Sequence, residues 1–212
     1  LLLISAGFLL LSGLAVWAIT LPIPDFTQFF EERAITQSTK IFDRTGEILL
    51  YDVHSEIKRT VIPLEEINPY AKQAAIAIED ENFYTHGGIQ PLSILRALMV
   101  DILTGELKQG GSTITQQVIK LTILNKEKKF SRKIKEVVLA IKLEGVMTKD
   151  QILSLYLNEA PYGGNLYGIE IASKSFFGKS AKDLSLAEAA YLAAMPQAPT
   201  FYSPYGDNRP KL

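Results

Sequence analysis

Cysteine is absent from this chain of 212 residues, and histidine occurs only twice. The absence of cysteine excludes disulfide bridges, a thiolate nucleophile and cysteine-ligated zinc. His54 and His86 lie 32 residues apart and are too few for the histidine-rich sites that hold zinc. Disulfide-stabilised and zinc-dependent classes of protein are therefore set aside.

Charged residues are missing from the start of the chain. No charged side chain occurs before Asp25, and the stretch up to Leu21 is apolar on every face. Its length matches the roughly 20 apolar residues that a membrane-spanning helix requires, whereas a signal peptide has a shorter apolar core. A buried core helix is the alternative. We predict a transmembrane anchor over residues 1–23 and a juxtamembrane linker over residues 24–39.

The remaining charges nearly cancel, but they are unevenly distributed. A net charge of −1 argues against a general nucleic-acid binder. The segment from Lys120 to Lys149 nevertheless holds nine Lys or Arg against three Glu, which predicts that an anionic group binds nearby. Within this segment Arg132 and Glu136 are four residues apart on one helix face, so a carboxylate is expected beside a guanidinium.

Strand-like and helix-like patterns divide the chain at Pro63. Two β-like runs, residues 40–42 and 48–53, flank turn residues 43–46 and predict a hairpin. After Pro63 the pattern is helical, with no return to strand. Helix starts are predicted at Asn68, Pro91, Ser112, Ser131, Thr148 and Ser185, and helix ends at Glu79, Gly105 and Gly178. The helix over residues 91–105 is apolar almost all round, which fits either a core helix or one that lies against lipid.

The stretch EDENFYTHGG, residues 79–88, places three acids, two aromatic residues and a histidine where a helix gives way to glycines. Glu79 is predicted at the C-terminal end of that helix, where the helix dipole disfavours a carboxylate. This position should raise the pKa of Glu79, as suits a base that works near neutral pH. The alternative is that Glu79, Asp80 and Glu81 form an ordinary solvated helix end.

Five sequence blocks, taken in order, resemble the peptidoglycan glycosyltransferases of family 51, the membrane-bound domain of class A penicillin-binding proteins. The blocks are EDENFYTHGG at 79–88, GGSTITQQ at 110–117, RKIKEVVLAIKLE at 132–144, KDQILSLYLNEAPYG at 149–163 and GIEIASKSFFGK at 168–179. The resemblance implies a mainly α, lysozyme-like, two-lobed domain over residues 40–204. Its smaller, membrane-facing lobe is expected at about residues 89–125, and residues 205–212 are expected to begin a linker to a further C-terminal domain.

The same resemblance implies a reaction and a set of residues that carry it. Lipid II, a lipid-linked disaccharide pentapeptide, is polymerised into glycan strands with inversion at the anomeric carbon, and undecaprenyl pyrophosphate leaves. Glu79 matches the catalytic base and Glu136 the second essential acid, near the pyrophosphate or a divalent cation, Mg²⁺ or Mn²⁺. The residues that match substrate-binding positions are Arg96, Gly111, Ser112, Thr113, Gln116, Gln117, Lys120, Lys128, Arg132 and Lys133. Those that match supporting positions are Asp80, Phe83, His86 and Asn158.

The implied partners and location follow from that reaction. They are lipid II, the growing lipid-linked glycan, the membrane, the phosphoglycolipid inhibitor moenomycin and cell-wall assembly proteins, with no nucleic acid. The implied location is the bacterial cytoplasmic membrane, crossed once, with the catalytic domain on the extracytoplasmic, periplasmic side.

Three other functions compete with this interpretation. A lytic transglycosylase or lysozyme of the same fold would cleave glycan, using a Glu as general acid, but it has no pyrophosphate to stabilise. Ser55 to Lys58 reads S-x-x-K, as in penicillin-binding transpeptidases and β-lactamases, but it follows a strand and lacks the other motifs. A non-catalytic scaffold that binds lipid pyrophosphates would not require both Glu79 and Glu136.

Overall fold

The computed structural model describes residues 12–13, 17, 20, 39–47, 49–53, 58–93, 96, 99, 111–124 and 130–197. Nearly all of the predicted anchor and linker, most of the helix after Pro91, Lys128, Ser55 to Ile57 and residues 205–212 lie outside these ranges. Within the described ranges, no helix is both long and apolar enough to cross a membrane.

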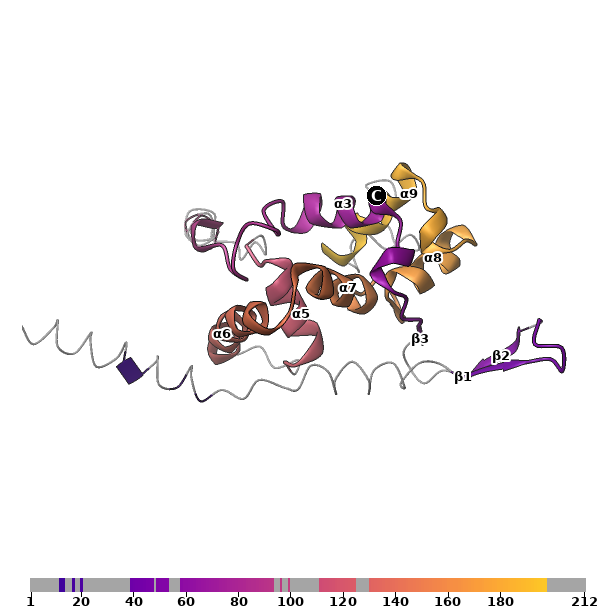
Figure 1. The fold of residues 1–212 in the computed structure, drawn as a ribbon, viewed down its shortest axis with the longest axis horizontal. Helices are drawn as coiled ribbons and strands as arrows, with labels where there is room; N and C mark the ends of the chain where they lie inside the picture. The colour runs from indigo at the N-terminus through magenta and orange to yellow at the C-terminus, as the bar shows by residue number, and fades with distance from the viewer. Residues whose placement is uncertain are drawn as a thin grey trace, which may run out of the picture.

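A two-stranded antiparallel pair comes first. Strand β1, Thr39–Phe42, pairs with β2, Leu49–Val53, with Ile41 opposite Tyr51 (Figure 1). The turn between them is closed by the Gly46 N–H, which donates to the Asp43 carbonyl at 3.0 Å. The Thr45 hydroxyl donates to the Asp43 carboxylate at 2.6 Å.

The body of the protein is helical, which confirms the mainly α class predicted from sequence. The α-helices are α3 (Pro69–Glu79), α5 (Ile114–Thr122), α6 (Phe130–Val146), α7 (Lys149–Glu159), α8 (Ile169–Phe177) and α9 (Leu186–Ala194). Single 3₁₀ turns are η1 (Leu64–Glu66), η2 (Ala181–Asp183) and η3 (Met195–Gln197). Residues 91–93, 96 and 99 are also helical, as predicted for the segment after Pro91.

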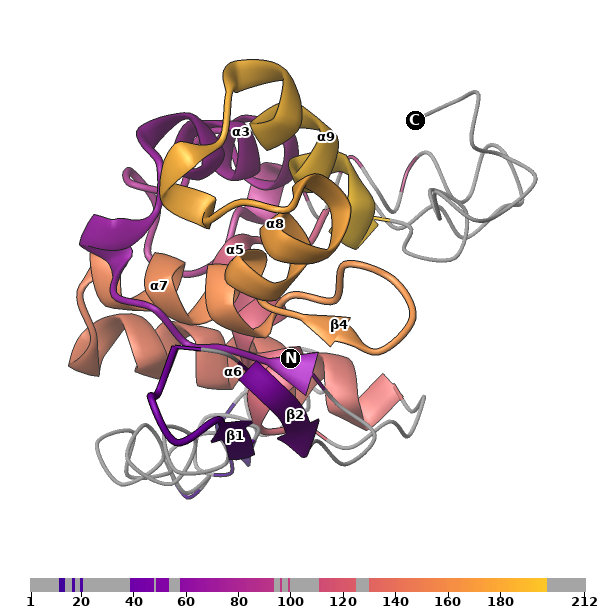
Figure 2. The same cartoon turned by 90° about the vertical axis from the view of Figure 1, so that its right-hand side faces the viewer.

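Helix α7 forms the centre of this body. It runs between α3 and α9 on one side and α6 on the other, with α5 packed against both α6 and α7 (Figures 1 and 2). Its side chains from Ile152 to Glu159 are buried with the single exception of Ser154, so the helix has almost no solvent-facing side beyond its first turn. Each large apolar side chain buried in this way stabilises the fold by roughly 1.5–3 kcal/mol.

The N-cap residues agree with the sequence prediction at some helix starts and differ from it at others. Asn68 accepts from the Tyr70 N–H at 2.9 Å, and capping boxes open α7 at Thr148 and α9 at Ser185, as predicted. The prediction for α5 is wrong by one residue, because Thr113 rather than Ser112 is the N-cap and forms a capping box with Gln116. Ser131 was predicted to cap α6, but that helix already begins at Phe130.

The chain does return to strand after Pro63, contrary to the sequence prediction. Strand β4, Leu166–Tyr167, pairs in parallel with β3, Lys58–Arg59. Asn158 secures this region, because its side chain accepts from the Ile62 N–H and donates to the Ile62 carbonyl, both at 3.0 Å. A two-residue strand is too short to leave a periodic pattern in the sequence, so only its pairing with β3 identifies it.

Candidate active site

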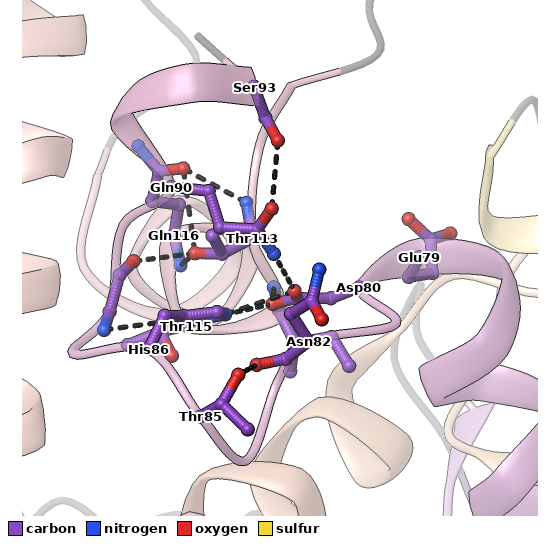
Figure 3. Close-up of polar contacts among 12 residues, drawn as sticks. Glu79, Asp80, Asn82, Thr85, His86, Gln90, Ser93, Thr113, Thr115 and Gln116 are labelled. Atoms are coloured by element: carbon purple, nitrogen blue, oxygen red, sulfur yellow. Dashed lines mark hydrogen bonds and ion pairs between the residues drawn. The ribbon is translucent and has the colours of Figure 1, made fainter.

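Asp80, the residue after α3, accepts several hydrogen bonds that hold the loop over residues 80–88. Its side chain is buried and accepts from His86 Nε2 at 2.8 Å, Gln90 Nε2 at 2.6 Å and the Ile114 N–H at 3.0 Å (Figure 3). His86 Nδ1 accepts from the Gly88 N–H at 3.1 Å, so the imidazole proton lies on Nε2. These bonds occupy Asp80 and His86 within the loop, which suits the supporting role expected of both.

Lys149 and Glu144 hold the other side of the same loop. Lys149 Nζ donates to the His86 carbonyl at 2.7 Å and to Glu144 Oε1 at 2.7 Å. It also lies 4.5 Å from the ring centroid of Phe83, which is fully buried, in a cation–π contact. Sequence reasoning did not single out Lys149, because its position at the start of α7 gives no sign of its distant partners.

Gly88 closes the loop against α6. Its φ of +86° is a left-handed conformation, and a Cβ there would lie 2.8 Å from the Ala140 carbonyl oxygen. The Thr113 hydroxyl donates to the Gly88 carbonyl at 2.6 Å, so the α5 N-cap fixes the end of the loop.

Replacing Gly88 with alanine is expected to destabilise the protein by roughly 1–3 kcal/mol, since it combines left-handed strain with a backbone clash. The matched control is Gly87→Ala, because a Cβ at Gly87 meets nothing within 4 Å. Urea denaturation of both variants measures the difference. Equal stability of the two variants would contradict the close approach of Gly88 to α6.

Glu79, the last residue of α3, faces away from the Asp80 cluster (Figure 3). Gln117 Nε2, from α5, donates to Glu79 Oε2 at 2.5 Å. The other oxygen, Oε1, is buried and has no hydrogen-bond partner among the described residues. One oxygen of the carboxylate is thus held in place while the second remains able to accept a proton.

The pKa of Glu79 is raised above its ordinary value of 4.5, in the direction predicted from sequence. The main cause is burial, which disfavours the charged form, and not the helix dipole on which the prediction was based. The hydrogen bond from Gln117, the nearby Tyr156 hydroxyl and the charge of Lys120 lower the pKa, and the charge of Asp80 raises it. A base with a raised pKa binds the transferred proton more strongly.

The second acid, Glu136, is buried on α6 and has a different cationic partner from the one predicted. Lys133 Nζ donates to Glu136 Oε1 at 2.5 Å, whereas the sequence pointed to Arg132. Lys133 Nζ also donates to the Ser112 hydroxyl at 2.8 Å. The start of α5 therefore connects to both acids. Gln117, within the helix, donates to Glu79, and Ser112, just before it, accepts from Lys133, the partner of Glu136.

The other expected binding residues differ in how far they are exposed. Lys120 is exposed in the last turn of α5, Arg132 is half-buried on α6, and Arg96 is exposed. Thr113 and Gln116 are buried and bond to each other in the capping box. Gly111 lies half-buried ahead of α5. Among the residues that the structure describes, no three His, Cys, Asp or Glu side chains group closely enough to hold a metal ion.

Comparison with known proteins identifies the family. The model of the transglycosylase family matches residues 46–211. The chain is 41% identical over 195 residues to penicillin-binding protein 1A of Aquifex aeolicus, covering 91% of this chain and 26% of that protein. It is 45% identical over 167 residues to penicillin-binding protein 1F of Bacillus subtilis, covering 79% and 23%. For penicillin-binding protein 1A of Escherichia coli the identity is 41% over 165 residues, covering 78% and 19%.

The chain spans about a quarter of the length of the first two of these curated relatives and a fifth of the third. The matched region includes every described residue of α3, of the loop over residues 80–88 and of α5 to α9. The chain belongs to the transglycosylase family.

Proposed function

We propose that this chain is a peptidoglycan glycosyltransferase that polymerises lipid II into glycan strands. One observation carries the proposal: Gln117 holds one oxygen of a buried carboxylate, Glu79, while the second oxygen has no partner among the described residues. A sugar hydroxyl is a weak nucleophile and needs a base of this kind. Membership of the transglycosylase family supports the same reaction.

In the proposed reaction the 4-hydroxyl of the acceptor's GlcNAc attacks C1 of the donor's terminal MurNAc. Glu79 Oε1 takes the hydroxyl proton as the new C–O bond forms. The bond between C1 and the phosphate oxygen breaks, and its electron pair leaves with undecaprenyl pyrophosphate. Attack from the face opposite the leaving group converts the α-linkage into a β-linkage.

The leaving pyrophosphate needs positive charge rather than a proton. Lys133 and Ser112, bonded to each other beside Glu136, supply a cation and a hydroxyl, and Arg132 lies in the same helix as Lys133. Lys120 lies near enough to Glu79 to lower its pKa. Lys128 and Arg96 are proposed to join them around the phosphates.

A divalent cation, Mg²⁺ or Mn²⁺, is proposed to bind with the donor. Magnesium sites in phosphate-binding enzymes use one or two carboxylates together with substrate phosphates and water. Glu136 with the donor pyrophosphate fits that ligand set, although Lys133 already neutralises the carboxylate. When bound, the cation would neutralise charge on the leaving group.

The proposed substrate has a lipid tail, so the enzyme must work at a membrane surface. Leu92 and Met99, in the helical segment after Pro91, are 78% and 56% exposed, and Arg96 between them is also exposed. Apolar side chains flanking a cation suit a helix that lies in the headgroup region. We propose a two-lobed domain that is anchored in the bacterial cytoplasmic membrane, with its active site on the extracytoplasmic side. The phosphoglycolipid moenomycin would occupy the donor site.

Purified lipid II and finished cell wall distinguish synthesis from cleavage. We expect the full chain with Mg²⁺ to convert labelled lipid II into long glycan, resolved by gel electrophoresis, and to release no soluble fragments from isolated cell wall. Release of fragments with no polymerisation would instead support a lytic transglycosylase. Binding of lipid II without either product would support the non-catalytic scaffold.

A further inference from the structure

The Tyr156 hydroxyl, on the central helix α7, is a buried polar group that the fold alone does not explain. The side chain is only 1% exposed, and Oη has no hydrogen-bond partner among the described residues. Leaving such a group unsatisfied costs about 1–3 kcal/mol, and native proteins rarely do so without a functional reason. Phenylalanine would fill the same space without that cost.

The neighbour of this hydroxyl is the proposed base. The Tyr156 hydroxyl lies close enough to Glu79 to lower the pKa of its carboxyl, and both this hydroxyl and Glu79 Oε1 are buried without a hydrogen-bond partner among the described residues. Burial and the charge of Glu79 together raise the pKa of Tyr156 well above its ordinary value. The phenol therefore stays protonated at neutral pH and can serve as a donor.

The other groups around Glu79 act on its carboxylate in ways that differ from that of Tyr156. Gln117, from α5, already occupies Oε2, and Lys120, from the same helix, acts on the carboxylate through its charge. The charge of Asp80, which follows α3, raises the pKa of Glu79 and so disfavours its ionisation. Tyr162, buried beyond the end of α7, interacts with Glu79 only through charge.

We propose that Tyr156 is a positioning residue for the base, and that its hydroxyl donates to the Glu79 carboxylate and orients Oε1 toward the acceptor. The inference rests on the proposed function. This hydrogen bond forms when the acceptor enters, because catalytic hydrogen bonds commonly tighten only once the substrate is bound. Because a donor stabilises the ionised carboxylate more than the protonated carboxyl, it keeps a buried base available at neutral pH.

The test is the pH dependence of polymerisation by Tyr156→Phe in the full chain. Loss of the hydroxyl should shift the acid limb of the kcat profile to higher pH. A shift of one pKa unit lowers kcat about tenfold on the acid side. The activity should recover at high pH, and KM for lipid II should change little. Tyr162→Phe is the matched control, because it removes another buried tyrosine hydroxyl near Glu79, and its acid limb should stay in place.

The outcomes separate this inference from the proposed function. An unmoved acid limb in Tyr156→Phe, an equal shift in both variants, or a loss that is the same at every pH would each overturn the positioning role. If the wild-type chain makes no glycan, the proposed function fails. The inference is then decided by infrared titration of isotopically labelled glutamate, because the Glu79 carboxylate band should titrate at higher pH in Tyr156→Phe than in wild type. Unchanged titration would refute it.

Discussion

Glu79→Gln is expected to reduce polymerisation of lipid II by about 10²- to 10⁴-fold, the usual contribution of a general base. Glutamine keeps the shape of the side chain and can still accept from Gln117, but it cannot take the proton of the acceptor hydroxyl. Initial rates of glycan formation under saturating lipid II measure the effect. Binding of lipid II should largely survive.

The stability of Glu79→Gln should not fall with its activity. Because the pKa of Glu79 is raised in the folded protein, its carboxyl ionises more readily in the unfolded chain. The contribution of Glu79 to stability therefore falls as pH rises from the unfolded value of about 4.5 through the folded pKa. At neutral pH Glu79→Gln should melt at the wild-type temperature or higher, and below the unfolded value the difference should vanish.

Glu81→Gln is the matched control, since this neighbouring carboxylate is exposed. It should polymerise lipid II at close to the wild-type rate. Wild-type activity in Glu79→Gln would refute the assignment of the base. A loss of activity accompanied by a large fall in melting temperature would instead point to a structural role for Glu79.

Asp80→Ala is expected to reduce the free energy of unfolding by roughly 3–5 kcal/mol, because three hydrogen-bond donors lose the buried carboxylate that accepts from them, at about 1–3 kcal/mol for each donor left unsatisfied. His86, Gln90 and the Ile114 N–H all donate to this one carboxylate. The loop over residues 80–88 would lose its link to the start of α5, and activity should fall with stability. Chemical denaturation gives the free energy, and the lipid II assay gives the rate.

Glu81→Ala serves as the control for this prediction, because it removes an adjacent but exposed acid. Its free energy of unfolding should stay within about 0.5 kcal/mol of wild type. If Asp80→Ala were equally harmless, the three hydrogen bonds would not be what fixes the loop. If Asp80→Ala lost activity while remaining fully stable, Asp80 would belong to the reaction itself.

The helical class and several helix boundaries were determined by sequence alone, because their signals are local. Asn68 before Pro69, and the capping boxes at Thr148 and Ser185, satisfy backbone N–H groups within one turn. The placement of Glu79 at the end of a helix followed from the same local rules. Matching motifs also identified the family that the comparison found.

Tertiary structure alone decided which side chains meet. Lys149 bonds to the His86 carbonyl 63 positions earlier, and Gln117 reaches back 38 positions to Glu79. The choice of Lys133 over Arg132 as the partner of Glu136 depended on how α6 faces Ser112. The pKa of Glu79 likewise depends mainly on burial, which is created by packing, whereas the helix-end position visible in the sequence predicted only its direction. Sequence specifies local hydrogen bonding, but burial and long-range partners exist only after the helices have packed.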